Sequence, residues 1–147
     1  PECDDIWKKI QNRLIQRVSF IRPDDDPQIL LDRLKAHERV SRDLGMQEEV
    51  AHSLAGQAYA HRLRREPEKA LQKLRDEEKI WRARDNKTRI AECLTQQALL
   101  LANDMSMPRE ALGPAEEAAK LAASFELLEL SNDVLARLLE HIRASLR

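Results

Sequence analysis

Four histidines are the most obvious candidates in this sequence for acid–base or metal chemistry. They are His37, His52, His61 and His141, and no two of them form a His-x-x-x-His pair. No Cys-x-x-Cys occurs either, so neither zinc nor iron has a ligand spacing to support it. His52 and His61 are nine positions apart, which places them on roughly opposite sides of a helix. We therefore interpret the histidines as surface or groove residues.

The other reactive side chains give no catalytic pattern. Nothing in the sequence pairs Cys93 with a base, and there is no Gly-x-Ser-x-Gly motif and no Gly-rich phosphate loop. Glu77 and Glu78 could act as paired carboxylates. However, Glu78 and Arg82 have the i,i+4 spacing of an ion pair on a helix surface. We predict that the chain is not an enzyme and binds no metal or cofactor.

The overall composition argues against nucleic acids and membranes as partners. The chain has 25 basic and 26 acidic residues, whereas phosphate binding needs a basic surplus. Aromatic residues are too few for base-stacking platforms. No apolar run reaches the roughly 18 residues of a membrane span, and no signal peptide is visible. The isolated thiols of Cys3 and Cys93 fit a reducing compartment, so we expect a cytoplasmic protein.

The stretch from Leu31 to Leu100 repeats itself at a spacing of 40 positions. The matched pairs include Leu31 and Leu71, Leu34 and Leu74, Glu38 and Glu78, Arg42 and Arg82, Ala51 and Ala91, Leu54 and Leu94, and Gln57 and Gln97. A fixed period of about 20–50 residues marks a repeat array, in which each unit buries its apolar face against its neighbour. The repeat therefore predicts the architecture of most of the chain.

Helix start and stop signals divide the repeat into helices. The start signals are Asp26-Pro27, Glu66-Pro67 and Met107-Pro108, with Asp26 as an N-cap and each Pro at the first helical position. Gly45 suits the left-handed residue that ends a helix, and Asn86 is the second choice for the same role. The apolar pattern predicts helices over 5–20, 27–44, 47–64, 67–84, 87–104 and 126–145, with another beginning near 108.

Two details of the helices are specific predictions. In the helix over 27–44, we expect Ile29, Leu30, Leu34 and Val40 to face inward. Pro108 follows Pro67 after 41 rather than 40 residues, which predicts one inserted residue in the loop 105–107.

Pro114 interrupts the next helical stretch. Because Pro breaks the hydrogen-bond ladder of a helix, the helix over 108–123 is either kinked or starts late, near Pro114.

The predicted fold class is therefore all-α, an α-solenoid of about seven helices in antiparallel pairs. We expect one domain over 1–147. A partial repeat helix occupies 5–22, complete helix pairs occupy 27–64 and 67–104, and an irregular last pair with a capping helix occupies 108–147. No segment alternates with period two, so no strands are predicted.

The segments SLAGQAYAHRLRREPEKALQKLRDEEKIWR and CLTQQALLLANDMSMPREAL resemble the tetratricopeptide repeat (TPR), in its long-period form of about 40–42 residues. Kinesin light chains and large bacterial signalling proteins contain this form. Ala55 and Thr95 stand where the repeat usually has Gly, and Leu74 stands at its aromatic position. The resemblance implies a protein-interaction scaffold that binds a protein or peptide in a concave groove lined by the first helix of each pair.

The free faces of these first helices carry the candidate groove residues. They are Asn12, Gln16 and Phe20 in the first segment, His52, Gly56 and Tyr59 in the second, and Glu92, Gln96 and Leu99 in the third. Gln57 and Gln97 occupy a repeated position one residue further round. Their amides either bind a peptide backbone or form hydrogen bonds with polar groups of a neighbouring helix. The mixture of polar and apolar side chains indicates an extended peptide or a helix as the ligand.

The alternative function is a sensor or regulatory TPR region of a larger signalling enzyme, an NTPase or a protease, that lies outside this sequence. The beginning at Pro1 rather than Met favours this alternative. A catalytic domain beside this segment in the full-length gene would support it. We also expect self-association through the open N-terminal end, at Trp7 and Ile10, because an uncapped solenoid end leaves apolar surface exposed.

Overall fold

The described part of the chain is all-helical. The computed structural model describes residues 7, 8, 12, 22, 24–125 and 132–147. Its helices are α2 (Pro27–Asp43), α3 (Gln47–Leu63), α4 (Pro67–Ala83), α5 (Lys87–Leu99), the π-helical turn η1 (Leu100–Asp104), α6 (Pro108–Phe125) and α7 (Asn132–Ser145). No strand occurs among these residues. No helix within the described ranges is long and apolar enough to cross a membrane.

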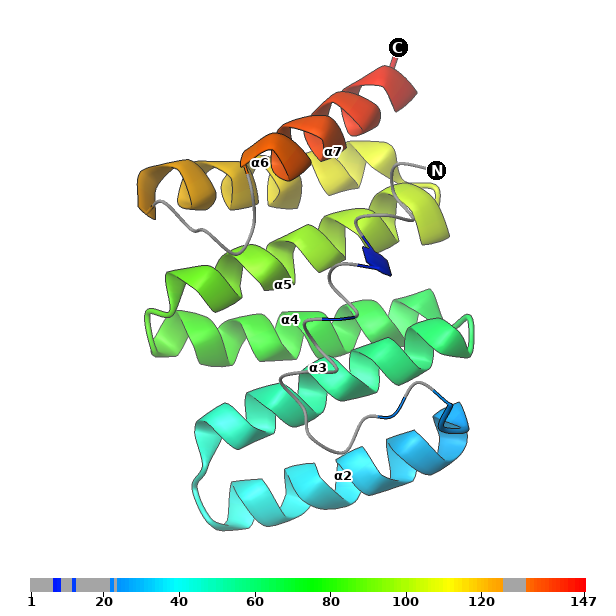
Figure 1. Ribbon diagram of the computed structural model, residues 1–147, viewed down its shortest axis with the longest axis vertical. Helices are drawn as coiled ribbons and strands as arrows, with labels where there is room; N and C mark the ends of the chain where they lie inside the picture. Colours follow the sequence, from blue (N-terminus) through cyan, green and yellow to red (C-terminus); the bar gives the residue numbers. More distant parts are fainter. Residues whose placement is uncertain (1–6, 9–11, 13–21, 23, 126–131) are drawn as a thin grey trace.

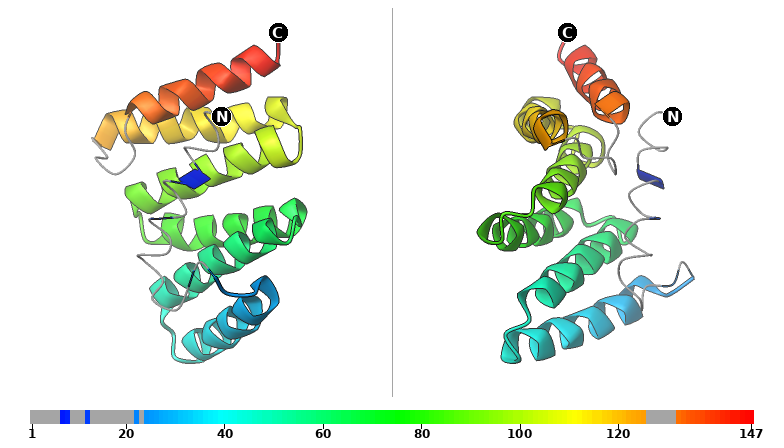
Figure 2. Two further views of the ribbon diagram at one scale, coloured as in Figure 1. Left: turned by 45° about the vertical axis from the view of Figure 1, so that its right-hand side comes forward. Right: turned by 60° about the vertical axis from the view of Figure 1, so that its left-hand side comes forward.

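The helices form a stack in chain order. Each helix from α2 to α7 packs against the next one along the chain, and η1 also contacts α4 and α6. Figure 1 shows this order directly, with α2 at one end of the stack and α7 at the other. The two rotated views keep the same order, so the layering does not depend on the direction of view (Figure 2). Neighbours in sequence are therefore neighbours in space.

Four turns of three residues each connect the helices from α2 to α6. Each contains one residue with positive φ, and these residues are Gly45, Arg65, Asp85 and Ser106. Three turns close with the same backbone hydrogen bond, for example from Met46 N–H to Ser41 C=O at 2.9 Å, as in a Schellman motif. The expectation for Gly45 is confirmed. At the α4–α5 turn Asp85, not Asn86, adopts the left-handed conformation, and the Asn86 side chain instead caps α5 by accepting from Arg89 N–H.

The inserted residue lies in a helix and not in the loop. The turn through Met105, Ser106 and Met107 has the same length as the others, so the predicted insertion in that loop is wrong. The extra residue is taken up by η1, where the N–H of Met105 donates to the C=O of Leu100 at 2.9 Å. A hydrogen bond to the fifth preceding residue holds one more residue per turn than an α-helix does.

The helix starts agree with the Pro signals. Asp26 caps α2, its carboxylate accepting from the backbone N–H of Gln28 at 2.8 Å, and Pro27 is the first helical residue. α6 begins at Pro108 and continues through Pro114, so the predicted late start near Pro114 is wrong. Within the segment 5–22, where a helix was expected, the structure describes Trp7, Lys8 and Asn12, which are helical, and Arg22, which is not. Residues 126–131 of the last predicted helix lie outside the described part.

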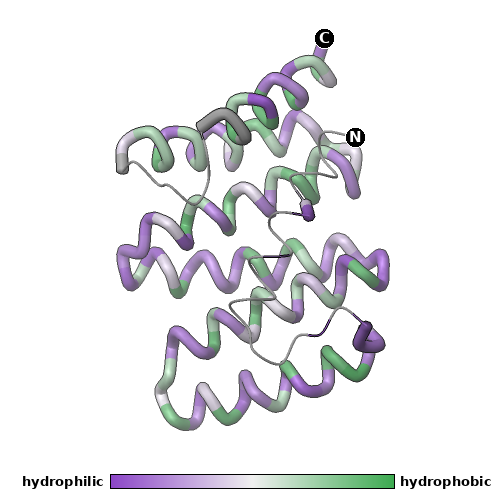
Figure 3. The backbone as a smooth tube through the Cα atoms, viewed as in Figure 1, coloured by the Kyte–Doolittle hydropathy of each residue, from purple (hydrophilic) through white to green (hydrophobic). Residues whose placement is uncertain are grey.

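Alanines and leucines form the core between the helices. Ala51, Ala55 and Ala91 are completely buried, so the neighbouring helices approach closely at these positions, as the small side chains indicate. Along α2, Leu30 and Leu34 are buried, but Ile29 and Val40 are exposed. The inward orientation expected for these last two residues is wrong, because they lie on the face of α2 that α3 does not cover. In Figure 3 hydrophobic positions recur along each helix of the stack.

Candidate binding surface

Most of the predicted groove residues are buried. Gly56, Gln57, Glu92, Gln96, Gln97 and Leu99 are all buried, His52 and Tyr59 are half-buried, and Asn12 is exposed. Gln16 and Phe20 lie outside the described residues. In this arrangement the six buried residues do not lie on an open surface. The physical reason is that α5 from Ile90 onward and the first two residues of η1 are buried at every position up to Leu101, so no side of this stretch is left open.

The two repeated glutamines hold neighbouring helices together. Gln57 donates its side-chain amide to Glu38 at 2.7 Å, and Gln97 donates to Glu78 at the same distance. Each carboxylate also accepts from an arginine of its own helix, Arg42 for Glu38 and Arg82 for Glu78. The structure therefore favours the second of the two interpretations: these amides satisfy a neighbouring helix.

The hydrogen bonds also act on the protonation of Glu38. Burial works to raise the pKa of Glu38, but the hydrogen bonds from Gln57 and Arg42 outweigh burial and leave that pKa below its usual range. The charged form is thus the one that the α2–α3 contact requires.

One cluster has the residue types of a hydrolase triad. The Nδ1 atom of His37 hydrogen-bonds the hydroxyl of Ser53, and Nε2 lies 3.5 Å from a Glu49 carboxylate oxygen. Ser53, however, is fully buried in the middle of α3, so no substrate can reach its hydroxyl. The sequence did not indicate this contact because the three residues match no local motif. We interpret the cluster as a structural link between α2 and α3.

A buried polar network lies between α4 and α5. Trp81 is 2% exposed, and its indole N–H donates to Glu77 at 2.8 Å. The thiol of Cys93 lies 3.2 Å from the Leu74 carbonyl oxygen and 3.3 Å from a Glu77 carboxylate oxygen. Trp81 is therefore packed inside the stack, where it cannot serve as an exposed anchor for a peptide. Glu77, which the sequence offered as one of two paired carboxylates, is buried.

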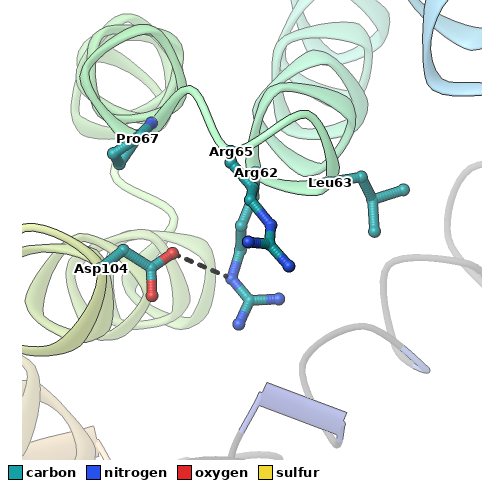
Figure 4. A pocket seen from close by; sticks show the side chains of 5 residues that line it. All are labelled: Arg62, Leu63, Arg65, Pro67 and Asp104. Carbon is teal, nitrogen blue, oxygen red and sulfur yellow. Dashed lines mark ion pairs between the residues drawn. The ribbon is translucent and has the colours of Figure 1, made fainter.

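An open pocket lies where α3 ends. Its volume is about 510 Å³, and it is lined by Arg62, Leu63, Arg65, Pro67 and Asp104. Figure 4 shows that the lining comes from the end of α3, the turn after it, the first residue of α4 and the end of η1. The Nε atom of Arg62 lies 3.3 Å from a carboxylate oxygen of Asp104, across the pocket wall. Burial raises the pKa of Asp104, although Arg62 opposes this rise.

Trp7 covers the Arg62 side chain beside this pocket. The guanidinium carbon of Arg62 lies 3.7 Å from the centre of the Trp7 ring, within the distance of a cation–π interaction. Trp7 is only 6% exposed and belongs to the same buried cluster as Ala58 of α3 and Leu99 of α5. Its buried indole N–H finds no acceptor in the part of the chain that the structure describes. The prediction that Trp7 marks an exposed end is therefore wrong, and Ile10 lies outside the described residues.

The sequence did not indicate Arg62 or Asp104 as site residues. At the repeat spacing Arg62 corresponds to Ala102, so its partners have no counterpart in the other copy. Among the described residues, no group of three or more His, Cys, Asp or Glu side chains is placed to hold a metal ion.

Comparison with known proteins adds no relative to this description. No protein-family model matches the chain, and neither a curated protein nor a solved structure was found to match it. The resemblance to the tetratricopeptide repeat thus depends on the residues quoted above.

The buried side chain of His61 leads to a prediction about pH. Burial lowers the pKa of His61, and the Glu66 carboxylate, 3.2 Å from Nδ1, opposes this only in part. A group with a lowered native pKa loses stability as the pH falls below its unfolded pKa, about 6.5 for His. Between about pH 7.5 and 5.5, we expect the free energy of unfolding to fall, by at most about 1.4 kcal/mol per pH unit from this group.

His61→Leu should remove that part of the pH dependence, because the other copy carries Leu101, also buried, at the same position. Urea unfolding followed by circular dichroism at both pH values measures the change. His141→Gln, at an exposed position of α7, is the matched control and should leave the dependence intact. If lowering the pH reduced the free energy of unfolding equally in His61→Leu and in the unchanged chain, the pH dependence would not come from His61.

Proposed function

We propose that this chain is a protein-interaction scaffold that binds a helical segment of a partner protein around Arg62, where α3 ends. One observation carries the proposal. Trp7, a helical residue, lies buried against Arg62 and shares a cluster with α3 and α5 residues. A surface that already binds the aromatic side chain of one helical residue can bind an aromatic side chain from a partner helix in the same way.

The repeat geometry supports the solenoid part of the proposal. The left-handed turn residues recur at intervals of 20, 20 and 21 positions. The bridge from Gln57 to Glu38 recurs from Gln97 to Glu78. Units that repeat both in sequence and in their contacts are the defining property of a solenoid. We propose that the stack is such a solenoid of the tetratricopeptide type. With α3 and α5 as first helices, its pairs are α3–α4 and α5–α6, in place of the pairs over 27–64 and 67–104 given from the sequence.

The side chains at the pocket define the partner that fits. An aromatic ring placed over Arg62 gains burial and a cation–π interaction, together worth about 1–2 kcal/mol beyond exposure on a free helix. The lining of the pocket has two guanidinium groups, Arg62 and Arg65, against one carboxylate, Asp104. An acidic residue one turn from the aromatic residue would complement the remaining positive charge. The partner is thus an amphipathic helix with an aromatic anchor and a neighbouring acidic residue.

A peptide-binding experiment tests the proposal with a known probe. The probe is a fluorescein-labelled synthetic peptide with the sequence of residues 1–22, and its anisotropy is measured against the full chain carrying Trp7→Ala. We expect micromolar binding to Trp7→Ala and weaker binding to the unchanged chain, whose own Trp7 occupies the site. Removing the guanidinium in Trp7→Ala/Arg62→Ala should weaken binding about tenfold, which corresponds to about 1.4 kcal/mol.

Two further variants separate the site from the rest of the surface. Tyr59 lies one helical turn before Arg62, so Trp7→Ala/Tyr59→Ala should also weaken binding. Trp7→Ala/Arg75→Ala removes an exposed arginine of α4 instead and should leave the affinity unchanged. Failure of the peptide to bind Trp7→Ala, or equal binding to all three double variants, would refute the proposed site.

A further inference from the structure

The outer face of α2 is an unusual surface for this chain. Large hydrophobic side chains with more than a third of their area exposed are few among the described residues. Four of the seven belong to α2 and the turn after it: Ile29 at 51%, Val40 at 56%, Leu44 at 67% and Met46 at 48%. Single exposed hydrophobic residues are ordinary, whereas a concentration of them marks an interaction surface.

The repeat supplies an internal control for these residues. At the corresponding positions α4 and its turn carry Lys69, Ile80, Arg84 and Asn86. Lys69 and Arg84 are exposed, so the helical fold itself needs no hydrophobic residue there. Ile80, the one hydrophobic residue in this set, packs against the buried cluster that contains Trp81. The fold of the repeat therefore does not explain why α2 has hydrophobic residues at these exposed positions.

The direction of this face follows from the contacts of the other helices. Ile29 and Val40 are eleven positions apart, which places them about 20° apart on one face of the helix, with Ala36 between them. In α6, Glu117 reaches back along the stack to Arg82 of α4, at 2.7 Å. At the repeat spacing Glu117 corresponds to Ala36. The face around Ala36 therefore points away from the stack, toward the side on which a helix preceding α2 would pack. In Figure 1, α2 is the helix at the end of the stack.

We propose that this face binds a second copy of the chain, with the two α2 helices antiparallel around a twofold axis. The residues of α2 complement themselves in this orientation. In one register Ile29 lies opposite the partner's Val40. The partner's exposed Arg39 is then about two residues, or roughly 3 Å, along the helix axis from the exposed Asp32, within reach of its long side chain. The symmetry repeats both contacts, so the interface gains two hydrophobic pairs and two opposite-charge pairs.

The size of the face sets the expected strength of the dimer. One helix pair extended by Leu44 and Met46 buries less than the roughly 1,200–2,000 Å² of a stable interface. The association is therefore weak, with a dissociation constant in the micromolar range.

Sedimentation velocity of the full chain, from about 1 to 300 μM, measures the dimer. We expect a monomer–dimer equilibrium in the unchanged chain. Ile29→Lys and Leu44→Arg introduce the residues that the other copy carries in exposed positions, so they preserve the fold and should make the chain monomeric. Leu146→Lys, an exposed hydrophobic position at the other end of the chain, is the control and should leave the dimer intact.

A charge exchange tests the register. Asp32→Arg places like charges opposite each other and should weaken the dimer at least tenfold, and Arg39→Asp should do the same. The double variant Asp32→Arg/Arg39→Asp restores opposite charges and should recover the dimer. A chain that stays monomeric over the whole range, a dimer that Ile29→Lys and Leu44→Arg leave unchanged, or a double variant no stronger than the single ones would overturn the proposal.

Discussion

Trp81→Ala is expected to lower the free energy of unfolding by about 4–6 kcal/mol. The indole is 2% exposed and fills the space between α4 and α5, with the His52 ring 5.6 Å away. Truncation leaves a cavity in a closely packed core, which alone costs about 3–5 kcal/mol for a large aromatic side chain. It also removes the donor that bonds Glu77, a buried carboxylate, and the loss of such a partner costs about 1–3 kcal/mol.

Urea unfolding followed by circular dichroism measures this loss. Trp81→Phe separates the two contributions, because it keeps most of the ring volume and removes only the N–H donor. We expect it to cost about 1–3 kcal/mol. Arg75→Ala, on the exposed face of the same helix, should change stability by no more than about 0.5 kcal/mol. A loss below about 2 kcal/mol for Trp81→Ala would mean that Trp81 does not join the repeats as described.

The helices were predictable because each rests on a local signal. Pro27, Pro67 and Pro108 mark the starts, and the apolar period marks the faces. The turns were harder, since residue type indicates the left-handed position only at Gly45. Arg65, Asp85 and Ser106 adopt it because the turn geometry is imposed by the repeat spacing, against their intrinsic preference. Period is thus a better guide to these turns than composition.

The candidate site was predictable only in part. Helical periodicity gives the direction of a side chain around its own helix, but not what covers that direction. It assigned Tyr59 and Gln96 to the free faces of their two helices, yet Gln96 is buried and Tyr59 is half-buried. The contact of Trp7 with Arg62 joins segments far apart in the chain and has no repeated counterpart. No sequence pattern within one chain could reveal it.

The second prediction concerns deletion of Asn103, which we expect to destabilise the chain much less than deletion of Leu63 does. The π-helical turn holds one residue more than the repeat requires, and Asn103 lies within it, half-buried. Its removal allows an ordinary α-helical turn and restores the spacing of 20 between left-handed turn residues. We therefore expect the deletion to cost no more than about 1–2 kcal/mol, in contrast to most single-residue deletions in helices.

Deletion of Leu63, the residue that corresponds to Asn103 in the other copy, is the matched control. α3 ends without a π-helical turn, so this deletion rotates the start of α4 by about 100° and shortens the connection by about 1.5 Å. The buried residues Ala70, Leu71 and Leu74 of α4 can then no longer all occupy the core. We expect a loss of at least about 3–5 kcal/mol, measured by urea unfolding of both variants.

The two deletions also connect the turn to the pocket. With Asn103 removed, the Asp104 carboxylate takes the position that Leu63 has in α3, and so loses the ion pair with Arg62. The fold should survive while peptide affinity at Arg62 changes. Equal costs for the two deletions would show that the extra residue supports the fold. A small loss of unfolding free energy on deletion of Asn103 would show that the stack does not need the extra residue. Its effect would then be on the surface around Arg62.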